Sequence, residues 1–518
     1  MIRQNTSTST WRKKSRGHGR GSEAKVWRGH EGDCHTLFEK LREEGKEVVL
    51  LESGGGAVSD GAVSGGASRV VSAGWSFVCV VNKKVRVPEG EAGLVFMREF
   101  IGKNGKGAGL NSTGFSSGMS GLPEGKTLAS FTPKAIKATA RLGAEAAVPF
   151  TAGFVGFVSY DLGEKWMGVG VSMESPLVAR PGGDAFMPPR VASIRPGIPL
   201  AYFIYTDEVY AFKNKSHVVR GRATSAHAEN ASVNGNASLL THTPPQATLS
   251  RDEYFKNLAV IRTHLFAGDT YQINFSQRFE APFSGDAFEV YKKITAINPS
   301  PFQFFMEMPR FAVISNSPEK LFSLNMVGVV ETQPIKGTVP RGATAKDDAC
   351  AVKALLASGK ERSELAMIVD LARNDLGKIC VPGSVKVAAK RAVQKYSHVI
   401  HTVATIRGKL EKKYDWYDAL RALFPGGSVT GCPKKRSMEI INALEDEARG
   451  VYCGSAGYID LSGSCNFNIM IRTLWLEKRG KSGTLTFRSG GGIVVESDPV
   501  SEYKETLHKA GAIIKALI

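Results

Sequence analysis

One lysine stands in a setting where its side chain could do chemistry. Lys336 lies between a strand-like stretch, residues 329–332, and a turn rich in glycine and proline. A lysine in this position is either a solvated charge at the end of a strand or a nucleophile, if a pocket lowers its pKa enough to leave part of it neutral. Most lysines are exposed, so the residue type alone favours the solvated charge.

Three glutamates fall on two predicted helices. Residues 361–376 carry apolar side chains at helical spacing, and Glu364 lies at the edge of the buried stripe that they define. In the last helix, Asp498 is a suitable N-cap, and Glu502 and Glu505 follow three residues apart on one face. Such carboxylates can bind a hard ion such as Mg²⁺, or they can form a solvated acidic face.

Further groups could bind an anion. Arg472 falls within an apolar predicted strand, where an inward guanidinium needs an anionic ligand or a structural salt bridge. The loop 424–434 opens a helix, so its hydroxyl and N–H groups could bind an anion. Consecutive glycines after the predicted strand 484–488 would let backbone N–H groups approach a carboxylate closely. These glycines are Gly490, Gly491 and Gly492.

Together these segments resemble the chorismate-utilising enzymes, a family that includes anthranilate synthase and aminodeoxychorismate synthase. Residues 334–338 read Pro-Ile-Lys-Gly-Thr, as in the aminodeoxychorismate-forming members, whereas anthranilate-forming members usually carry alanine in place of the lysine. Asn274 favours the same branch, because anthranilate-forming relatives usually carry valine at this position. The resemblance covers residues 34–518, weakly before 251 and strongly from 268 onwards.

The resemblance implies an α+β fold in which antiparallel β-sheets pack face to face and helices surround them. The composition and the resemblance predict four regions, namely a disordered basic tail at 1–33, an N-terminal anthranilate-synthase-like region at 34–213, a linker at 214–248 and a chorismate-binding catalytic region at 249–518. Residues 153–163 are predicted to be a strand that runs into a loop. The last helix is expected to bury Tyr503, Leu507, Ala510 and Ile514.

The activity that the resemblance implies is a transferase reaction, the amination of chorismate to 4-amino-4-deoxychorismate for 4-aminobenzoate and folate synthesis. In that reaction Lys336 attacks ring carbon C2, the C4 hydroxyl leaves with a proton from Glu319, and ammonia adds at C4 and displaces the lysine. Glu364 and Glu505 match the family's magnesium ligands, and Glu502 lies beside them.

The resemblance also implies which residues bind the substrate. His401 matches an active-site histidine of the family, and Ser428 and Tyr458 match positions that touch substrate in relatives. The full expected set is His401, Ser428, Tyr458, Arg472, Gly490, Gly491 and Gly492.

Two other functions stay open. Another enzyme of the same class would give anthranilate or isochorismate. A non-catalytic protein could use its basic tail to bind nucleic acid, although the set Lys336, Glu319, Glu364 and Glu505 argues against this alternative.

Composition sets further bounds. The 518 residues are 42% hydrophobic, enough for a large core. No apolar run of about 18 residues appears, so no membrane span is expected.

The net charge is +18, and residues 1–30 hold eight basic residues against one acid. This segment is predicted to be an inert tail or a mis-assigned start, and the protein to be cytoplasmic. A transit peptide to a plastid or another organelle is the alternative, and contact with nucleic acid is disfavoured because aromatic residues are not interleaved with the charges.

The seven cysteines bear on compartment and on the nitrogen donor. They form no C-x-x-C pair, which favours reduced thiols over a disulfide framework or a zinc site. None has the glycine turn and histidine that a glutaminase nucleophile needs, and the chain ends at Ile518, directly after the last helix. A separate glutamine amidotransferase subunit is therefore expected to supply ammonia.

Overall fold

The computed structural model describes most of the chain from Cys34 onwards. The described residues are 34–52, 75–83, 85–104, 150–169, 197–213, 216–217, 243–396, 399–445, 447–480 and 482–518. The predicted basic tail, 1–33, and most of the predicted linker, 218–242, lie outside them. In the described part of the chain, no helix is both long enough and apolar enough to cross a membrane.

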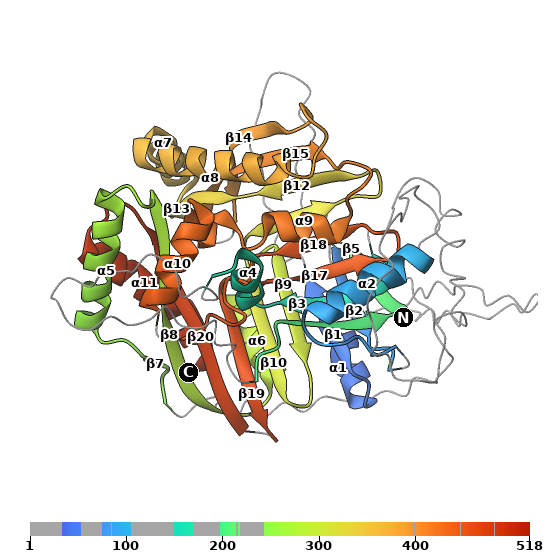
Figure 1. Cartoon of the computed structure of the whole chain (residues 1–518). Coiled ribbons are helices and arrows are strands. Elements are labelled where there is room, and N and C mark those ends of the chain that lie inside the picture. The colour runs from blue at the N-terminus through green and yellow to red at the C-terminus, as the bar shows by residue number, and fades with distance from the viewer. Residues whose placement is uncertain are drawn as a thin grey trace, which may run out of the picture.

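The larger of two sheets has eleven strands, and its named pairings are antiparallel (Figure 1). In spatial order its strands are β16 (Gly431–Cys432), β8 (Gln272–Ser284), β20 (Ser482–Ile493), β19 (Thr473–Arg479), β10 (Phe311–Ser317), β9 (Phe302–Glu307), β1 (Val48–Glu52), β2 (Trp75–Val80), β5 (Glu208–Lys213) and β6 (Ser216–His217), and β7 (Gln246–Ala247) also pairs with β8.

The smaller sheet has nine strands and is also antiparallel. Its order is β13 (Ile335–Pro340), β15 (Val399–Lys409), β12 (Val329–Gln333), β11 (Lys320–Leu324), β18 (Cys465–Asn468), β17 (Ser455–Asp460), β3 (Gly153–Val158) and β4 (Ala201–Thr206), with β14 (Lys386–Lys395) paired to β15. Strands from 34–213 and from 249–518 therefore contribute to both sheets.

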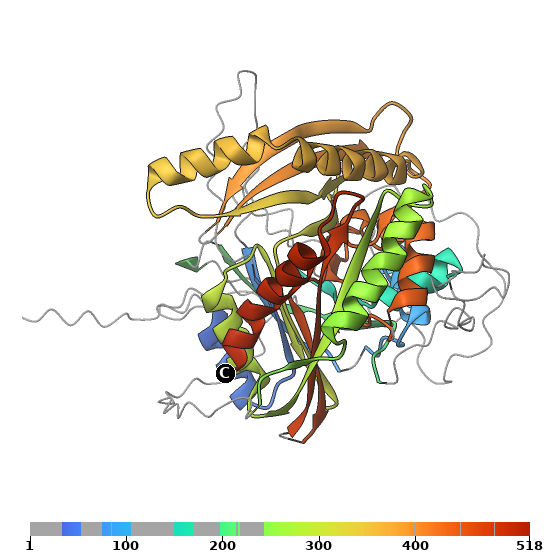
Figure 2. The same cartoon turned by 90° about the vertical axis from the view of Figure 1, so that its left-hand side faces the viewer.

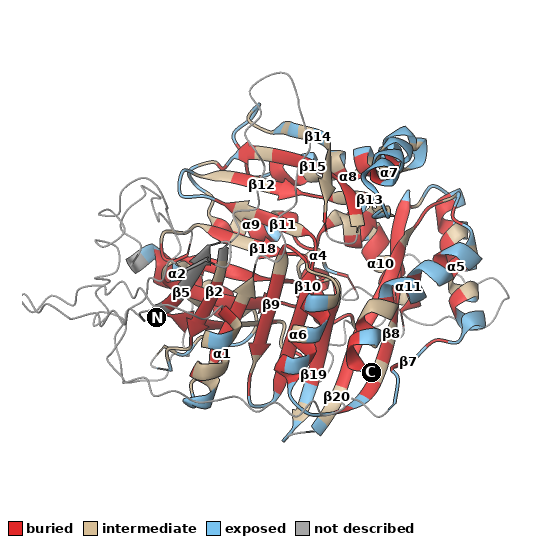
Figure 3. Ribbon diagram, turned by 180° about the vertical axis from the view of Figure 1, so that it is seen from behind, coloured by how far each residue is buried: buried red, intermediate tan, exposed pale blue. Residues whose placement is uncertain are grey.

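The core between the sheets joins apolar side chains from both, such as Phe77 and Trp475 from the larger sheet and Val155 and Phe157 from the smaller one. The predicted α+β fold, with antiparallel sheets packed face to face, is confirmed. The strands of the larger sheet are buried along most of their length, whereas the helices keep exposed outer faces (Figure 3).

Helices cover the outer faces of both sheets. On the larger sheet lie α1 (Cys34–Glu43), α6 (Ala287–Ile297), α11 (Pro499–Leu517), α5 (Arg251–Phe266) and α10 (Lys434–Leu444). The core on the other side of the smaller sheet includes α2 (Glu91–Asn104), α4 (Tyr160–Met167), α8 (Gly359–Gly377) and α9 (Trp416–Leu423), and α7 (Ala345–Ala357) precedes α8. Figure 2 shows α11, in red, beside α5, in green.

Two sequence predictions are corrected here. The strand β3 runs into helix α4 and not into a loop. Gly163 lies within α4. Glycine is required there because a Cβ would lie 2.4 Å from Pro425 and prevent α4 from packing against the loop 424–434. In α11, Ala510 is buried as predicted, but Leu507 is 38% exposed, and the buried face also carries the polar residues Glu502 and Thr506.

Candidate active site

A β-bulge between β13 and β15 sets the direction of Lys336. Lys336 pairs with Thr402 and Thr338 pairs with His401, so one residue of β13 is unpaired between them. That residue is Gly337, with φ +79°, and a Cβ on it would lie 2.9 Å from Leu355 Cδ1. A bulge redirects the side chains next to it, and glycine is the residue that adopts this φ without strain.

The Lys336 amine lies in a polar site next to Gly492, near the C-terminal end of β20. Its Nζ donates to Gln272 Oε1 at 3.1 Å and to Glu364 Oε2 at 3.3 Å, and the lysine side chain is 14% exposed. A Cβ at Gly492 would lie 3.1 Å from Nζ. The glycine therefore leaves the space that the lysine occupies. Lys336 is not a solvated charge at a strand end.

The three glycines belong to the strand and do not follow it, which corrects the predicted strand end at 488. Gly490, Gly491 and Gly492 continue β20 and pair with Ser276, Phe275 and Asn274 of β8. A Cβ at Gly491 would lie 3.2 Å from Glu502 Oε2 and 4.0 Å from Glu505 Oε1. The glycines therefore let the backbone approach the carboxylates of α11.

Four glutamates from two helices converge on this site. Glu361 and Glu364 lie one turn apart on α8, and Glu502 and Glu505 lie one turn apart on α11. Burial and the neighbouring charge of Glu364 raise the pKa of Glu361, and Glu505 adds to this effect from the other helix. Burial also raises the pKa of Glu502, and Glu505 contributes. The like charges therefore destabilise one another in the absence of a cation.

Lysine side chains already compensate part of this charge. Although burial pushes the pKa of Glu505 upwards, Lys509, at 2.7 Å, and Lys360 and Lys336 hold it below its ordinary value. Glu502 Oε1 accepts a hydrogen bond from Ser497 Oγ at 2.6 Å, which fixes its orientation.

The residues fit a magnesium site with few protein ligands. Carboxylate oxygens are the ligands that Mg²⁺ prefers, and Mg²⁺ usually takes one or two of them and keeps several waters. Among the described residues, no three of the four glutamates bring oxygens within 4.8 Å of one another, so they do not form a closed three-ligand cage. Glu364 and Glu505, one from each helix, remain the predicted ligands.

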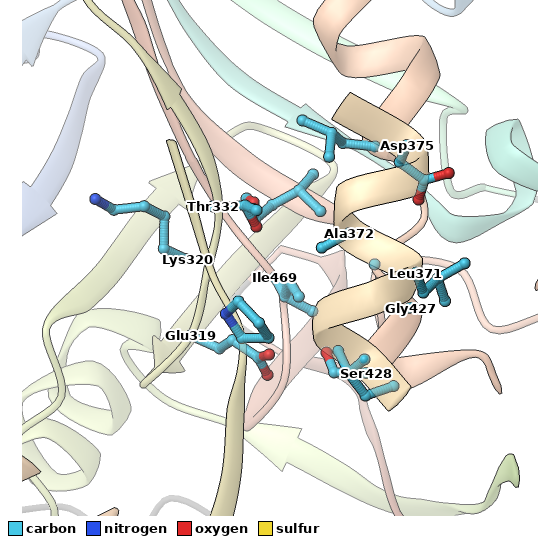
Figure 4. Close-up of a pocket in the computed structure, with 14 residues that line it drawn as sticks. Glu319, Lys320, Thr332, Leu371, Ala372, Asp375, Gly427, Ser428 and Ile469 are labelled. Atoms are coloured by element: carbon cyan, nitrogen blue, oxygen red, sulfur yellow. The ribbon is translucent and has the colours of Figure 1, made fainter. Parts of the chain in front are cut away.

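Glu319 lies between β10 and β11 and faces Ser428 in a small pocket (Figure 4). Its Oε1 accepts from Ile335 N at 3.3 Å, next to Lys336. Burial raises the pKa of Glu319 to about 7, against opposing effects of the Ser428 hydroxyl and the Lys336 charge. A carboxyl that is half protonated near neutral pH can act as a general acid.

The raised pKa of Glu319 makes a stability prediction. Between about pH 4.5 and pH 7 the folded state binds a proton that the unfolded state has lost, so this residue lowers stability as pH rises through that range. Glu319→Gln is therefore expected to be more stable than wild type at pH 8, by up to about 3 kcal/mol, and to lose this advantage at pH 4. Denaturant unfolding at both pH values measures the difference. An equal difference at pH 4 and pH 8 would show that Glu319 is ordinarily ionised.

The sequence predicted Arg472 on a strand, but it lies in the connection between β18 and β19, with φ +52°. Its side chain is half-buried, burial lowers the pKa of the guanidinium, and no described acidic side chain pairs with it. The rival interpretation, a structural salt bridge, therefore has no partner in the described part of the chain. A half-buried arginine with no counter-ion among the described residues favours an anionic ligand.

His401 lies close to this arginine and is buried. Its Nδ1 is 2.7 Å from the Thr338 hydroxyl. Burial and the positive charge of Arg472 lower the pKa of His401 to about 3, so the imidazole is neutral at pH 7. A neutral imidazole can donate or accept one hydrogen bond without adding charge to the site.

Tyr458 is placed apart from the other expected substrate-binding residues. Its ring stacks on Phe150 at 4.7 Å and meets the edge of Phe77 at 5.7 Å, in the core between the sheets. None of the contacts described for Tyr458 reaches Lys336 or Glu319.

A buried ion network holds the loop 424–434 in position. Arg449 pairs with Glu445 at 2.7 Å and donates to the carbonyl oxygens of Val429 and Asn274, at 2.8 and 2.6 Å. Ser428 precedes Val429 directly, so this arginine fixes the backbone that presents the Ser428 hydroxyl to Glu319.

Comparison with known proteins identifies the class to which this fold and site belong. The model of the family described as chorismate binding enzyme matches residues 111–515. The chain is therefore a member of the chorismate binding enzyme family.

Individual relatives make the comparison finer. The chain is 37% identical over 376 residues to aminodeoxychorismate synthase component 1 from Klebsiella aerogenes, covering 71% of this chain and 78% of the relative. It is 42% identical over 270 residues to anthranilate synthase component 1 from Saccharolobus solfataricus, covering 52% of this chain and 63% of the relative. The crystal structure of anthranilate synthase component I from Streptococcus pneumoniae TIGR4 superposes with a TM-score of 0.61 at 25% identity, covering 90% and 92% of the two chains.

Two residues of the site were not singled out from the sequence. Glu361 precedes Glu364 by three residues, the same spacing as Glu502 and Glu505, and this repeated spacing could have revealed it. Gln272 gave no such signal, because its contact with Lys336 depends on the pairing of β8 with β20.

Proposed function

We propose that the chain converts chorismate and ammonia into 4-amino-4-deoxychorismate, a precursor of 4-aminobenzoate and folate. The observation that carries the proposal is the position of the Lys336 amine, held between Gln272 and Glu364 beside four carboxylates. A lysine in this site can supply the nucleophilic nitrogen, whereas the alanine that anthranilate-forming relatives usually carry there cannot.

In the proposed reaction the neutral Lys336 amine forms a bond to ring carbon C2. The two ring double bonds shift and the C4–O bond breaks, and the departing hydroxyl takes a proton from Glu319 and leaves as water. Ammonia then bonds to C4, the double bonds shift back and the bond from C2 to Lys336 breaks. The surplus proton on the incoming nitrogen restores Glu319, so chorismate and ammonia give the amino product and water.

The metal would be Mg²⁺ bound by Glu364 and Glu505, with Glu361 and Glu502 beside it. When bound, it would hold a substrate carboxylate and neutralise the facing glutamates. The second carboxylate of chorismate is assigned to Arg472, since its guanidinium has no described acidic partner.

The remaining expected groups have supporting roles in this proposal. His401 orients the substrate as a neutral hydrogen-bonding group, and Ser428 bonds both Glu319 and substrate. Backbone N–H groups at Gly490, Gly491 and Gly492 are proposed to bind a substrate carboxylate. Tyr458 lies in the core between the sheets and would contact the substrate only if the substrate reached that core.

Ammonia is proposed to come from a separate glutamine amidotransferase subunit. The relatives' names, which include "component 1", support a second component. The purified chain is expected to use ammonium but not glutamine. Glutamine hydrolysis needs a thiolate, whereas burial raises the pKa of Cys432, and it raises that of Cys453 to about 12.

Initial rates with ammonium chloride and with ammonia-free glutamine measure this prediction. The expected result is product with ammonium and none above background with glutamine. A saturable glutamine-dependent rate that thiol alkylation abolishes would contradict it.

The alternative product is anthranilate, favoured by the 42% identity with an anthranilate synthase component 1. Incubation with chorismate, Mg²⁺ and ammonium, with and without aminodeoxychorismate lyase, separates the two. The proposal expects 4-aminobenzoate only when the lyase is present. Anthranilate formed without the lyase would overturn it.

A further inference from the structure

A second cluster of ligand-type side chains lies on the larger sheet, where α1 meets β1. Cys34 begins α1, His35 follows it, and Glu52 ends β1. The Cys34 thiol donates to Glu52 Oε1 at 2.9 Å, and His35 Nε2 lies 2.8 Å from Glu52 Oε2. Among the described residues, this is the one trio of cysteine, histidine or acidic side chains whose ligand atoms all lie within 4.8 Å of one another.

The three ligand types together suit a borderline-soft divalent metal. Zn²⁺ binds thiolate sulfur, imidazole nitrogen and carboxylate oxygen, whereas Mg²⁺ and Ca²⁺ take oxygen ligands. From the bond lengths of zinc sites, tetrahedral ligand atoms lie roughly 3.3–3.8 Å apart. The ligand atoms of the trio already lie within 4.8 Å of one another, so small side-chain shifts would place them around a metal.

Side chains of α6 contact two of these ligands, Glu52 and His35. The Tyr291 hydroxyl on α6 donates to Glu52 Oε2 at 2.5 Å, and the His35 ring meets the edges of Phe288 and Tyr291 at 5.6 and 5.9 Å. Although burial pushes the pKa of Glu52 upwards, the hydrogen bonds from His35, Cys34 and Tyr291 hold it below its ordinary value. Side-chain exposures of 27% for His35 and 11% for Glu52 leave a route from solvent.

We propose that Cys34, His35 and Glu52 bind one Zn²⁺ ion, with water at the fourth position. Binding would release the Cys34 thiol proton to solvent, since thiolate is the ligand form, and His35 would bind as the neutral imidazole. The ion would replace the hydrogen bonds that Glu52 now accepts from the other two ligands. It would clamp the first turn of α1 to the end of β1.

This site is separate from the glutamates of the candidate active site and independent of the proposed reaction. It involves α1, β1 and α6, whereas the glutamates lie on α8 and α11. Its ligand set also differs, because sulfur and nitrogen ligands discriminate against Mg²⁺. The metal can therefore be tested while excess Mg²⁺ occupies oxygen-ligand sites.

Cobalt provides the direct test, since Co²⁺ bound to thiolate gives a charge-transfer absorption that oxygen-bound Co²⁺ lacks. The chelator-treated full chain would be titrated with Co²⁺ and then with Zn²⁺, in excess Mg²⁺ and reductant. Wild type is expected to show this band at one Co²⁺ per chain and to lose it as Zn²⁺ displaces the cobalt. Cys34→Ser is expected to lack the band, and Cys350→Ser, a matched change at an exposed cysteine outside the cluster, to keep it.

Tyr291→Phe extends the test. It removes only the hydroxyl that donates to Glu52, and it is expected to weaken Zn²⁺ binding by about 10- to 100-fold, the usual range for a residue that orients a metal ligand. The metal-free melting temperature of each variant shows whether it is folded. If Cys34→Ser is unfolded, His35→Gln replaces it, with the same expected loss of stoichiometric binding.

Two outcomes would contradict the proposed zinc site. Absence of the thiolate band in wild type would show that the trio is only a hydrogen-bonded cluster. A band that survives in Cys34→Ser and disappears in Cys350→Ser would assign the metal to the exposed thiol, and either result overturns the proposal.

Discussion

Lys336→Ala is expected to lower the turnover of chorismate to the amino product by more than about 10³-fold, a loss of about 4 kcal/mol in transition-state stabilisation. The proposed reaction passes through a bond between the Lys336 nitrogen and ring carbon C2, and alanine cannot form it. The measurement is kcat at saturating chorismate, ammonium and Mg²⁺.

Two further variants distinguish a nucleophile from a positive charge. Lys336→Arg keeps the cation near Glu364 but provides no neutral amine, so it is expected to be as inactive as Lys336→Ala. Lys478→Ala removes another partly buried lysine, one that pairs with Glu307 at 2.6 Å, and it is expected to retain wild-type turnover. Substantial activity in Lys336→Arg would assign Lys336 an electrostatic role.

Glu364→Gln and Glu505→Gln are each expected to raise the Mg²⁺ concentration for half-maximal activity by at least about tenfold. Each substitution removes one charged oxygen from a site that has few protein ligands. Calorimetric titration with Mg²⁺ gives the same comparison without relying on turnover.

The two variants should differ at saturating Mg²⁺. Glu505 pairs with Lys509, whereas Glu364 also accepts from the Lys336 amine. High Mg²⁺ is therefore expected to restore Glu505→Gln more fully than Glu364→Gln. Glu439→Gln, a change at a helix glutamate that pairs with Arg436 and is about as exposed as Glu364, serves as the matched control. Unchanged Mg²⁺ dependence in both variants would mean that these glutamates only form an acidic helix face.

Local sequence chemistry accounts for the elements that were predicted well. Asp498 caps α11 by accepting from Ser501 N, and Pro499 occupies the first helical position, as the sequence indicated. Signals of this kind involve residues close in sequence, so they do not depend on the tertiary structure.

Long-range pairing decided the features that were not predicted. The three glycines of β20 were placed after the predicted strand, but twelve residue pairs between β20 and β8 keep them within it. Tertiary packing also placed Thr506 on the buried face of α11 and left Leu507 exposed, since Ser489 and Tyr254 bond Thr506 from the buried side. Sequence spacing cannot reveal such partners.

The candidate site combines both kinds of feature. The carboxylate pairs follow from helical spacing within α8 and α11. The meeting of the two helices at Lys336 depends on the bulge at Gly337 and on the close approach of β20 to α11. The sequence pattern therefore predicts the chemical groups, and the sheet topology brings them together.

The most direct test of the proposed function is the position of nitrogen in the product. Chorismate, Mg²⁺ and ¹⁵N-labelled ammonium would be incubated with the purified chain, without lyase, and the product examined by nuclear magnetic resonance and mass spectrometry. The proposal predicts one ¹⁵N bonded to ring carbon C4 with the enolpyruvyl group retained. Nitrogen at C2 of an aromatic ring, or oxygen at C2 with no nitrogen incorporated, would contradict it.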